Sequence, residues 1–176
     1  DGTNKKNFKS IPNDSNSLFT NRLECLFAGK SGFVWIGSTF EGLGRLDPTT
    51  ESFKHFQNEP GNPHSLSDNH VFALLEDRTG TLWIGTNKGL DTLDRGTGHF
   101  AHIRDNTPAG HSIIDATVRC IYEDHAGRIW IGTGNPFDPR DHPGNGLYKF
   151  EKESGTITHY RNDPEDPMSL TGNRIR

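Results

Sequence analysis

The tripeptide Trp-Ile-Gly occurs three times in this chain at an almost constant interval. Trp35, Trp83 and Trp130 lie 48 and 47 residues apart, and a Gly-Leu pair follows each of them. Self-similarity with a period of about 47 residues marks one supersecondary unit that stacks on copies of itself. The chain is therefore expected to be an array of similar units whose cores lie between neighbours.

Each copy predicts four short antiparallel strands. In the first copy, alternating apolar residues place strands near 23–29, 33–38, 43–47 and 53–57. A turn containing Asp and Gly separates the first two strands of the second and third copies, and it begins at Asp77 and Asp124. In the first copy Gly29 stands in place of this Asp. No segment shows a helical periodicity, so the sequence favours an all-β fold.

The composition favours stacked sheets over a conventional core. Only 30% of the 176 residues are hydrophobic, and the mean hydropathy is -0.76. One polar four-stranded sheet cannot bury both faces, but stacking covers the Trp, Ile and Leu of each copy with the next. Four strands and one Trp per repeat predict an all-β fold of β-propeller blades, about three complete blades with partial flanking strands. The tryptophans could instead stack on a sugar, but their equivalent positions favour packing between blades.

The blade boundaries follow from the repeat. Residues 1–22 are expected to form the end of a preceding blade, with Phe8 in its fourth strand, and a linker. Residues 174–176 are expected to begin a following blade, so the chain is interpreted as a fragment of a larger propeller. The three blades between them are expected at 23–69, 70–116 and 117–173, the last with a loop insertion at 135–145.

The segments between the blades repeat as well, and they make the pattern specific. The linkers NEPGNPHSLSDN (58–69) and NDPEDPMSLTGN (162–173) share both asparagines, both prolines and the Ser-Leu pair. In the second and third copies a linker precedes Asp-x-x-Gly-x-(Leu/Ile)-Trp-Ile-Gly-Thr and then Gly-Leu, whereas the linker 162–173 lies at the end of the given sequence. The whole pattern resembles the two-component regulator propeller repeat over nearly the entire chain.

That resemblance implies a sensor function. Such repeats form the sensor region, usually periplasmic, of bacterial membrane-bound regulators such as hybrid histidine kinases, and many of these resemble detectors of polysaccharide fragments. The resemblance therefore implies a periplasmic, non-catalytic fragment that binds a carbohydrate or oligosaccharide and packs on the remaining blades of its receptor. Members of the family usually carry more repeats, commonly in seven-bladed propellers followed by a β-sandwich, which these 176 residues do not contain.

Charge and hydropathy argue against two other kinds of partner. The net charge is -4 and no Lys/Arg cluster is present, so the chain lacks the electrostatic footprint of a nucleic-acid-binding protein. The longest apolar run, Val71 to Leu75, is far shorter than the ~20 residues of a membrane helix, and no signal-like segment follows Asp1. This segment is expected to contact neither nucleic acid nor membrane.

The repeat also accounts for residues that would otherwise indicate metal or redox chemistry. His55, His102 and His159 occupy one position of the fourth strand, which favours a role in the blade over metal ligation. Cys25 and Cys120 occupy one position of the first strand, two blades apart, so their Cα atoms are expected beyond the ~7 Å that a disulfide allows. No metal site and no cofactor are expected.

A propeller enzyme is the alternative to a sensor. The segment from Asp77 to Trp83 superficially resembles the Asp-box of sialidases, but its spacing is one residue too long and no arginine cluster is present. The Gly-x-x-Trp strands also resemble those of streptogramin lyases, which use a His and a metal on one propeller face. A streptogramin-lyase-like or other glycan-acting lyase or hydrolase therefore stays open, and no residue is assigned a catalytic role.

Candidate ligand-binding residues lie in the loops between the second and third strands. Antiparallel topology places these loops on the same propeller face as the loops that enter the next blade. They are short in the first two copies, but NPFDPRDHPGN interrupts the third. An aromatic ring among charged side chains suits a carbohydrate site, whereas a variable surface loop, or one that packs on another domain, is the alternative. The residues expected to bind ligand are Phe40, Glu41, Asn87, Lys88, Asn135, Phe137, Asp138, Arg140, Asp141 and His142.

The ends of the array predict self-association. Three stacked blades leave two apolar sheet faces without a neighbour, and the first and last copies keep Trp35 and Trp130 instead of a polar cap. The isolated chain is therefore expected to form a dimer with two-fold symmetry or to aggregate.

Overall fold

The computed structural model describes residues 5–104, 112–135 and 145–175, and these residues form three four-stranded antiparallel sheets. Among them the one helical element is the short 3-10 turn η1, so the predicted all-β fold of propeller blades is confirmed. The elements are β1 (Leu23–Ala28), β2 (Val34–Ser38), β3 (Leu43–Asp47), β4 (Ser52–Phe56), β5 (Val71–Glu76), β6 (Leu82–Thr86), β7 (Gly89–Leu93), β8 (Phe100–His102), η1 (Ile113–Asp115), β9 (Val118–Glu123), β10 (Ile129–Thr133), β11 (Leu147–Glu151) and β12 (Thr156–Tyr160).

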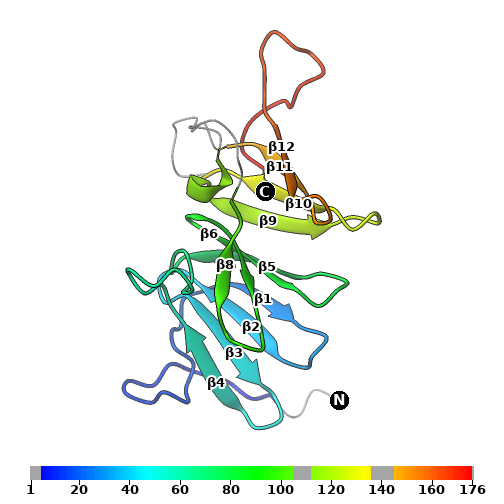
Figure 1. Ribbon diagram of the computed structural model, residues 1–176. Helices are drawn as coiled ribbons and strands as arrows, with labels where there is room; N and C mark the ends of the chain where they lie inside the picture. Colours follow the sequence, from blue (N-terminus) through cyan, green and yellow to red (C-terminus); the bar gives the residue numbers. More distant parts are fainter. Residues whose placement is uncertain (1–4, 105–111, 136–144, 176) are drawn as a thin grey trace.

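The three sheets stack face to face in chain order. Figure 1 shows them one above another, from β1–β4 at the bottom to β9–β12 at the top. Contacts between neighbouring sheets are made mainly by the first strands, since β1 meets β5 and β5 meets β9. The first strands therefore form the inner side of the array, and the fourth strands β4, β8 and β12 form its outer side.

Two of the three repeated tryptophans, Trp35 and Trp83, pack between the sheets, as the sequence predicted. Trp35 is 1% exposed and shares an apolar cluster with the second sheet, and Trp83 is 3% exposed and shares one with the third. Trp130 lies on the free face of the third sheet, where it is half-buried and stacks on Tyr160 with 6.0 Å between ring centroids. Burial of a large apolar side chain stabilises a fold by roughly 1.5–3 kcal/mol, so these positions hold the stack together.

The Gly after each Trp-Ile pair is required by the close approach of the next sheet. A Cβ atom at Gly37 or Gly85 would lie 2.8 or 2.6 Å from Cγ1 of the Val that begins the next first strand. At Gly132 the corresponding contact is with Cγ2 of Ile175, at 2.7 Å. Any larger residue would push the sheets apart and cost packing energy. Ile175 thus takes, after the third sheet, the place that Val takes after the first and second.

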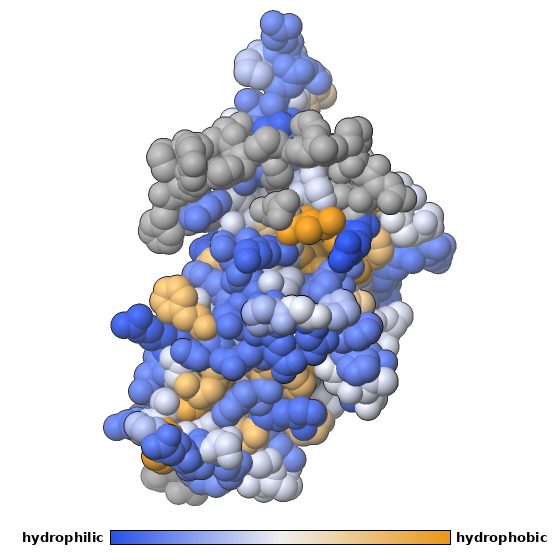
Figure 2. Space-filling view, turned by 60° about the vertical axis from the view of Figure 1, so that its left-hand side comes forward, coloured by the Kyte–Doolittle hydropathy of each residue, from blue (hydrophilic) through white to orange (hydrophobic). Residues whose placement is uncertain are grey.

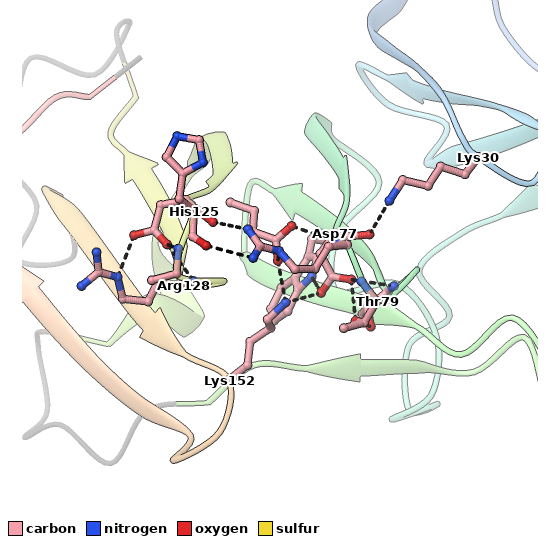
Figure 3. A network of polar contacts seen from close by, with 12 residues as sticks. Lys30, Asp77, Thr79, His125, Arg128 and Lys152 are labelled. Carbon is pink, nitrogen blue, oxygen red and sulfur yellow. Dashed lines mark hydrogen bonds and ion pairs between the residues drawn. The ribbon is translucent and has the colours of Figure 1, made fainter.

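A polar network joins the second turn to the third sheet. Asp77 Oδ2 accepts a hydrogen bond from Trp83 Nε1 at 3.0 Å and another from Lys152 Nζ at 3.0 Å, and Lys152 also lies 2.8 Å from Glu123 Oε1. Figure 3 shows Lys152 pointing at the turn beside Thr79. Burial alone would raise the pKa of Asp77, but the hydrogen bonds from Thr79, Trp83 and Lys152 outweigh it and hold this pKa well below 3.8.

Residues 5–22 cover part of the free face of the first sheet. Leu18 is 6% exposed and clusters with Ile36, and Phe8 packs edge-on against Phe53 with 5.6 Å between ring centroids. The prediction that Phe8 lies in a fourth strand is wrong, because residues 5–22 form no strand. A fourth strand needs a third strand to pair with, and the described residues contain none for this segment.

The surface is mostly hydrophilic, and Figure 2 shows apolar residues in small separate patches. Leu26 on the free face of the first sheet is 64% exposed, and Tyr122 on the free face of the third is 60% exposed. Each free face thus exposes an apolar side chain, and self-association of the isolated chain through these faces stays a prediction. Within the described ranges, no helix has the length and apolar character needed to cross a membrane.

Candidate functional site

The loops between second and third strands share one face of the array with the segments that enter the first strands. The backbone N–H of Asn87 donates to the carbonyl of His70 at 3.0 Å, and that of Thr39 donates to the carbonyl of Arg22 at 3.2 Å. We call this side the loop face. The turns that join first to second and third to fourth strands lie on the opposite side, the turn face. The loops described by the structure thus have the arrangement expected from antiparallel topology.

Each first strand carries a β-bulge near the loop face. The pairing register between first and second strands shifts on either side of Glu24, Phe72 and Arg119, so these are the extra residues of β1, β5 and β9. A bulge bends the strand and re-aims the side chain of its extra residue. The three bulges therefore present an acid, an aromatic ring and a base at equivalent places on the inner side of the array.

His70 joins these three residues into one group. Its Nε2 lies 3.4 Å from Glu24 Oε1, and its ring packs against the ring of Phe72 with 3.8 Å between centroids. The guanidinium of Arg119 lies 4.1 Å from the Phe72 centroid. On the other side of His70 lies Phe40, with 5.7 Å between ring centroids. We call Glu24, Phe40, His70, Phe72 and Arg119 the inner-rim cluster.

Phe40 gives the inner-rim cluster an exposed aromatic surface. Its side chain is 60% exposed on the loop after β2, and those of Glu24 and His70 are 34% and 23% exposed. Thr39 Oγ1 donates to Glu24 Oε1 at 3.2 Å, which orients the carboxylate. A ring beside a carboxylate, an imidazole and a guanidinium can stack on the C–H face of a sugar and hydrogen-bond its hydroxyls.

The structure describes four of the other nine residues predicted to bind ligand. Asn87 adjoins the cluster, because its backbone N–H donates to the carbonyl of His70 at 3.0 Å. Asn135 is the first residue of the insertion and the last one that the structure describes before 136–144. Glu41 lies on the Phe40 loop, where its Oε2 accepts from Gln57 Nε2 at 3.1 Å. Lys88 lines a separate pocket. The remaining five lie outside the described residues: Phe137, Asp138, Arg140, Asp141 and His142.

Sequence reasoning missed four members of the cluster: Glu24, His70, Phe72 and Arg119. Glu24, Phe72 and Arg119 lie within the first strand of each copy, where the run of apolar or alternating apolar and polar residues predicts a strand and no binding role. The sequence does contain one indication of a binding role: the three copies, which are similar elsewhere, have Glu, Phe and Arg at the same position of the repeat. A bulge cannot be located from such a pattern, so their common direction required the structure.

The described residues offer little for nucleophilic or metal chemistry. Burial raises the pKa of the Cys25 thiol to about 12, and burial also raises the pKa of Cys120, so neither is a thiolate nucleophile at neutral pH. Both thiols are free. Across the described ranges, no three His, Cys, Asp or Glu side chains gather in a way that would hold a metal ion.

The four-stranded sheets are stacked with their first strands inside, and the loop face lies opposite the turn face. This architecture defines the chain as a segment of a β-propeller. Residues 65–88 and 112–135 match the family described as Two component regulator propeller. Both segments run from the end of a linker, through the first two strands, to the loop face. Two segments of the chain therefore match the two-component regulator propeller repeat, in agreement with the resemblance found in its sequence.

Solved structures share this fold. The extracellular domain of the putative hybrid two component system BT4673 from B. thetaiotaomicron is 24% identical with a TM-score of 0.67, covering 91% of this chain and 19% of that chain. That of BT3049 from the same organism is 19% identical with a TM-score of 0.53, covering 94% and 32%. Virginiamycin B lyase from Staphylococcus aureus is 16% identical with a TM-score of 0.56, covering 89% and 45%.

These similarities establish the fold, which sensors and a lyase share. The chain spans about a fifth of the first of these structures and a third to a half of the other two. No curated protein compared with the chain matches it.

Proposed function

We propose that this chain is an extracytoplasmic, non-catalytic segment of the sensor propeller of a bacterial two-component receptor of the hybrid histidine kinase type, and that it binds a carbohydrate on its loop face. The observation that carries the proposal is the inner-rim cluster, in which the exposed Phe40 ring lies beside His70. His70 in turn contacts Glu24 and Phe72, and Arg119 lies over the Phe72 ring. The propeller repeats and the extracellular sensor domains of like fold support the receptor context. In the intact receptor the remaining blades would cover the two free sheet faces.

Isothermal titration calorimetry tests the proposal. The 176-residue chain is titrated with tetrasaccharides of glucose, galactose, xylose and galacturonate, and at least one is expected to bind saturably. Phe40→Ala is expected to weaken that binding about tenfold, equivalent to about 1.4 kcal/mol, because the stacking surface is lost. Tyr122→Ala is the matched control, since Tyr122 is also 60% exposed but lies on the free face of the third sheet.

A glycan-acting lyase is the second candidate function. The fold shared with virginiamycin B lyase, together with a His102 Nδ1 to Asp91 Oδ1 contact of 2.8 Å that could hold a base, favours keeping it. The same sugars incubated with the chain distinguish the two functions by chromatography of the products. Binding without cleavage supports the sensor. Cleavage that disappears in His102→Gln would replace the sensor proposal with the lyase.

A further inference from the structure

The histidine repeated in the fourth strands has different neighbours in each sheet. In the first sheet, the His55 ring packs with the Phe19 ring at 5.1 Å between centroids. Phe19 also fills the space beside Gly44, where a Cβ atom would lie 2.3 Å from the ring. In the third sheet, the His159 ring stacks flat on Tyr148, with 4.0 Å between centroids and 5° between the rings. Both histidines are packed by aromatic side chains.

The second sheet places a carboxylate where the other two have Gly44 and Tyr148. Asp91 is 0% exposed, and its Oδ1 lies 2.8 Å from His102 Nδ1. Its Oδ2 accepts a hydrogen bond from the backbone N–H of Ser67 at 2.8 Å. Because both oxygens of Asp91 make hydrogen bonds, the carboxylate has a fixed orientation, and its contact with Nδ1 orients the imidazole ring of His102. The other ring nitrogen, Nε2, is left for a ligand, and the His102 side chain is 23% exposed.

His102 lines a pocket of about 200 Å³ on the loop face. Leu90, Ile103 and Ile114 supply apolar walls, and Lys88 and Arg104 supply positive charge. Two carboxylates lie nearby, and neither lines the pocket. Asp91 is fully buried behind His102, and Asp68 lies 3.8 Å from the ammonium of Lys88, whose side chain remains 65% exposed.

We propose that this pocket binds one acidic sugar ring, with its anionic group between Lys88, His102 and Arg104 and its C–H face on the apolar walls. The proposal rests on the carbohydrate-binding function proposed above and names the class of sugar. The volume supports a single ring, because it is below the roughly 300–1,000 Å³ of pockets that enclose drug-sized ligands. The anionic group is a carboxylate or a sulfate ester, since both accept charge-assisted hydrogen bonds from Lys88 and Arg104.

Nuclear magnetic resonance titration of the ¹⁵N-labelled 176-residue chain tests this site with three monosaccharide probes: glucuronate, glucose 6-sulfate and glucose. The imidazole nitrogens of His102 and the amide of Ser67 are expected to shift saturably with one or both acidic probes, and glucose is expected to bind at least tenfold more weakly. The two acidic probes distinguish carboxylate from sulfate. Added salt is expected to weaken binding of the acidic probe, because the contacts are between charges.

Two variants locate the binding. His102→Gln and Lys88→Gln are each expected to weaken binding of the acidic probe at least fivefold, whereas His159→Gln, the matched position of the third sheet, is expected to leave it unchanged. Lys88 is exposed, so Lys88→Gln keeps the test valid if the His102 variant fails to fold. Equal binding of glucose, equal loss in His159→Gln, or no saturable shift at His102 would overturn the inference.

The same titration separates this inference from the proposed function. Sugar binding that depends on Phe40 but leaves His102 unshifted overturns the acidic-sugar pocket and keeps the carbohydrate sensor. Acidic-probe binding at His102 that persists in Phe40→Ala supports the pocket even where the inner-rim cluster binds nothing.

Discussion

The turn face and the loop face of this propeller segment use the same repeat in opposite ways. On the turn face, Asp77 and Asp124 make the same contact with the tryptophan of their own sheet, at 3.0 and 2.8 Å. On the loop face, equivalent positions differ, as the bulged Glu24, Phe72 and Arg119 do. The comparison indicates that residues shared by the copies stack the sheets, whereas residues that differ among copies are available for recognition.

The first turn shows what the turn face tolerates. Gly29 takes the place of the Asp, and Trp35 Nε1 is buried without a hydrogen-bond partner among the described residues. Glu76 of the next sheet approaches instead: its Oε2 accepts the backbone N–H of Lys30 at 3.2 Å and lies 2.8 Å from Arg95 Nη2. Packing against the neighbouring sheet is therefore kept at Trp35 as at Trp83, although Trp35 lacks the Asp that binds Nε1 of Trp83. Contacts between Glu76 and the first turn take the place of that Asp.

The largest effect that separates the two faces is expected for Asp77→Ala. It removes the acceptor of Trp83 Nε1 and the partner of Lys152, both of which are mostly buried, and should destabilise the chain by about 1–3 kcal/mol. Urea unfolding followed by tryptophan fluorescence measures it. Glu153→Ala, an exposed change on the same face, is the control and should stay within about 0.5 kcal/mol of the parent chain. Equal stability of both variants would contradict the role given to this turn.

The same turn predicts a pH dependence. Because the folded-state pKa of Asp77 lies below its ordinary value of 3.8, its contribution to stability is fully present above pH 3.8. That contribution is lost as the pH falls through the lowered folded-state value. The stability difference between the parent chain and Asp77→Asn should therefore narrow below pH 3.8 and stay constant from pH 5 to 7.

A smaller effect is expected for Gly29→Asp, which copies the second turn into the first. The new carboxylate could accept from Trp35 Nε1, but its Cβ would lie 2.8 Å from Glu76 Oε2 and bring two acids together. The net result should be a loss of about 1 kcal/mol, and Glu76→Gln in the same chain should recover part of it, since contacting residues are energetically coupled. If the changes in unfolding free energy of Gly29→Asp and Glu76→Gln simply add in the double variant, Glu76 does not occupy the place of the missing Asp.

Much of the fold could be predicted from sequence because each requirement recurs three times. The strands of the first copy, the inter-sheet tryptophans and the crowded Gly37, Gly85 and Gly132 all follow from period and spacing. The position of Phe8 could not be predicted, because a strand depends on a partner that the segment itself does not encode. Leu18, by contrast, follows the Ser-Leu pattern of the linkers and is buried as Leu66 is.

The candidate site was less predictable for a physical reason. Phe40 and Asn87 were found because loop positions follow from antiparallel topology. The contact of Glu24 with His70 joins two sheets and depends on a bulge, and neither feature leaves a pattern within one repeat. Likewise, the repetition of His102 predicts a structural role shared with His55 and His159. Its 2.8 Å contact with Oδ1 of Asp91, an acid that the other two copies lack, is visible only in the structure.

Hydrogen exchange of the 176-residue chain, with and without a saturating concentration of the tetrasaccharide that binds in calorimetry, tests the central claim most directly. The account predicts slower amide exchange on the loop face, in residues 39–42, 68–72 and 86–89, and unchanged exchange on the turn face, in residues 77–81 and 124–128. Slower exchange confined to the turn face, or none on the loop face at saturation, would contradict it.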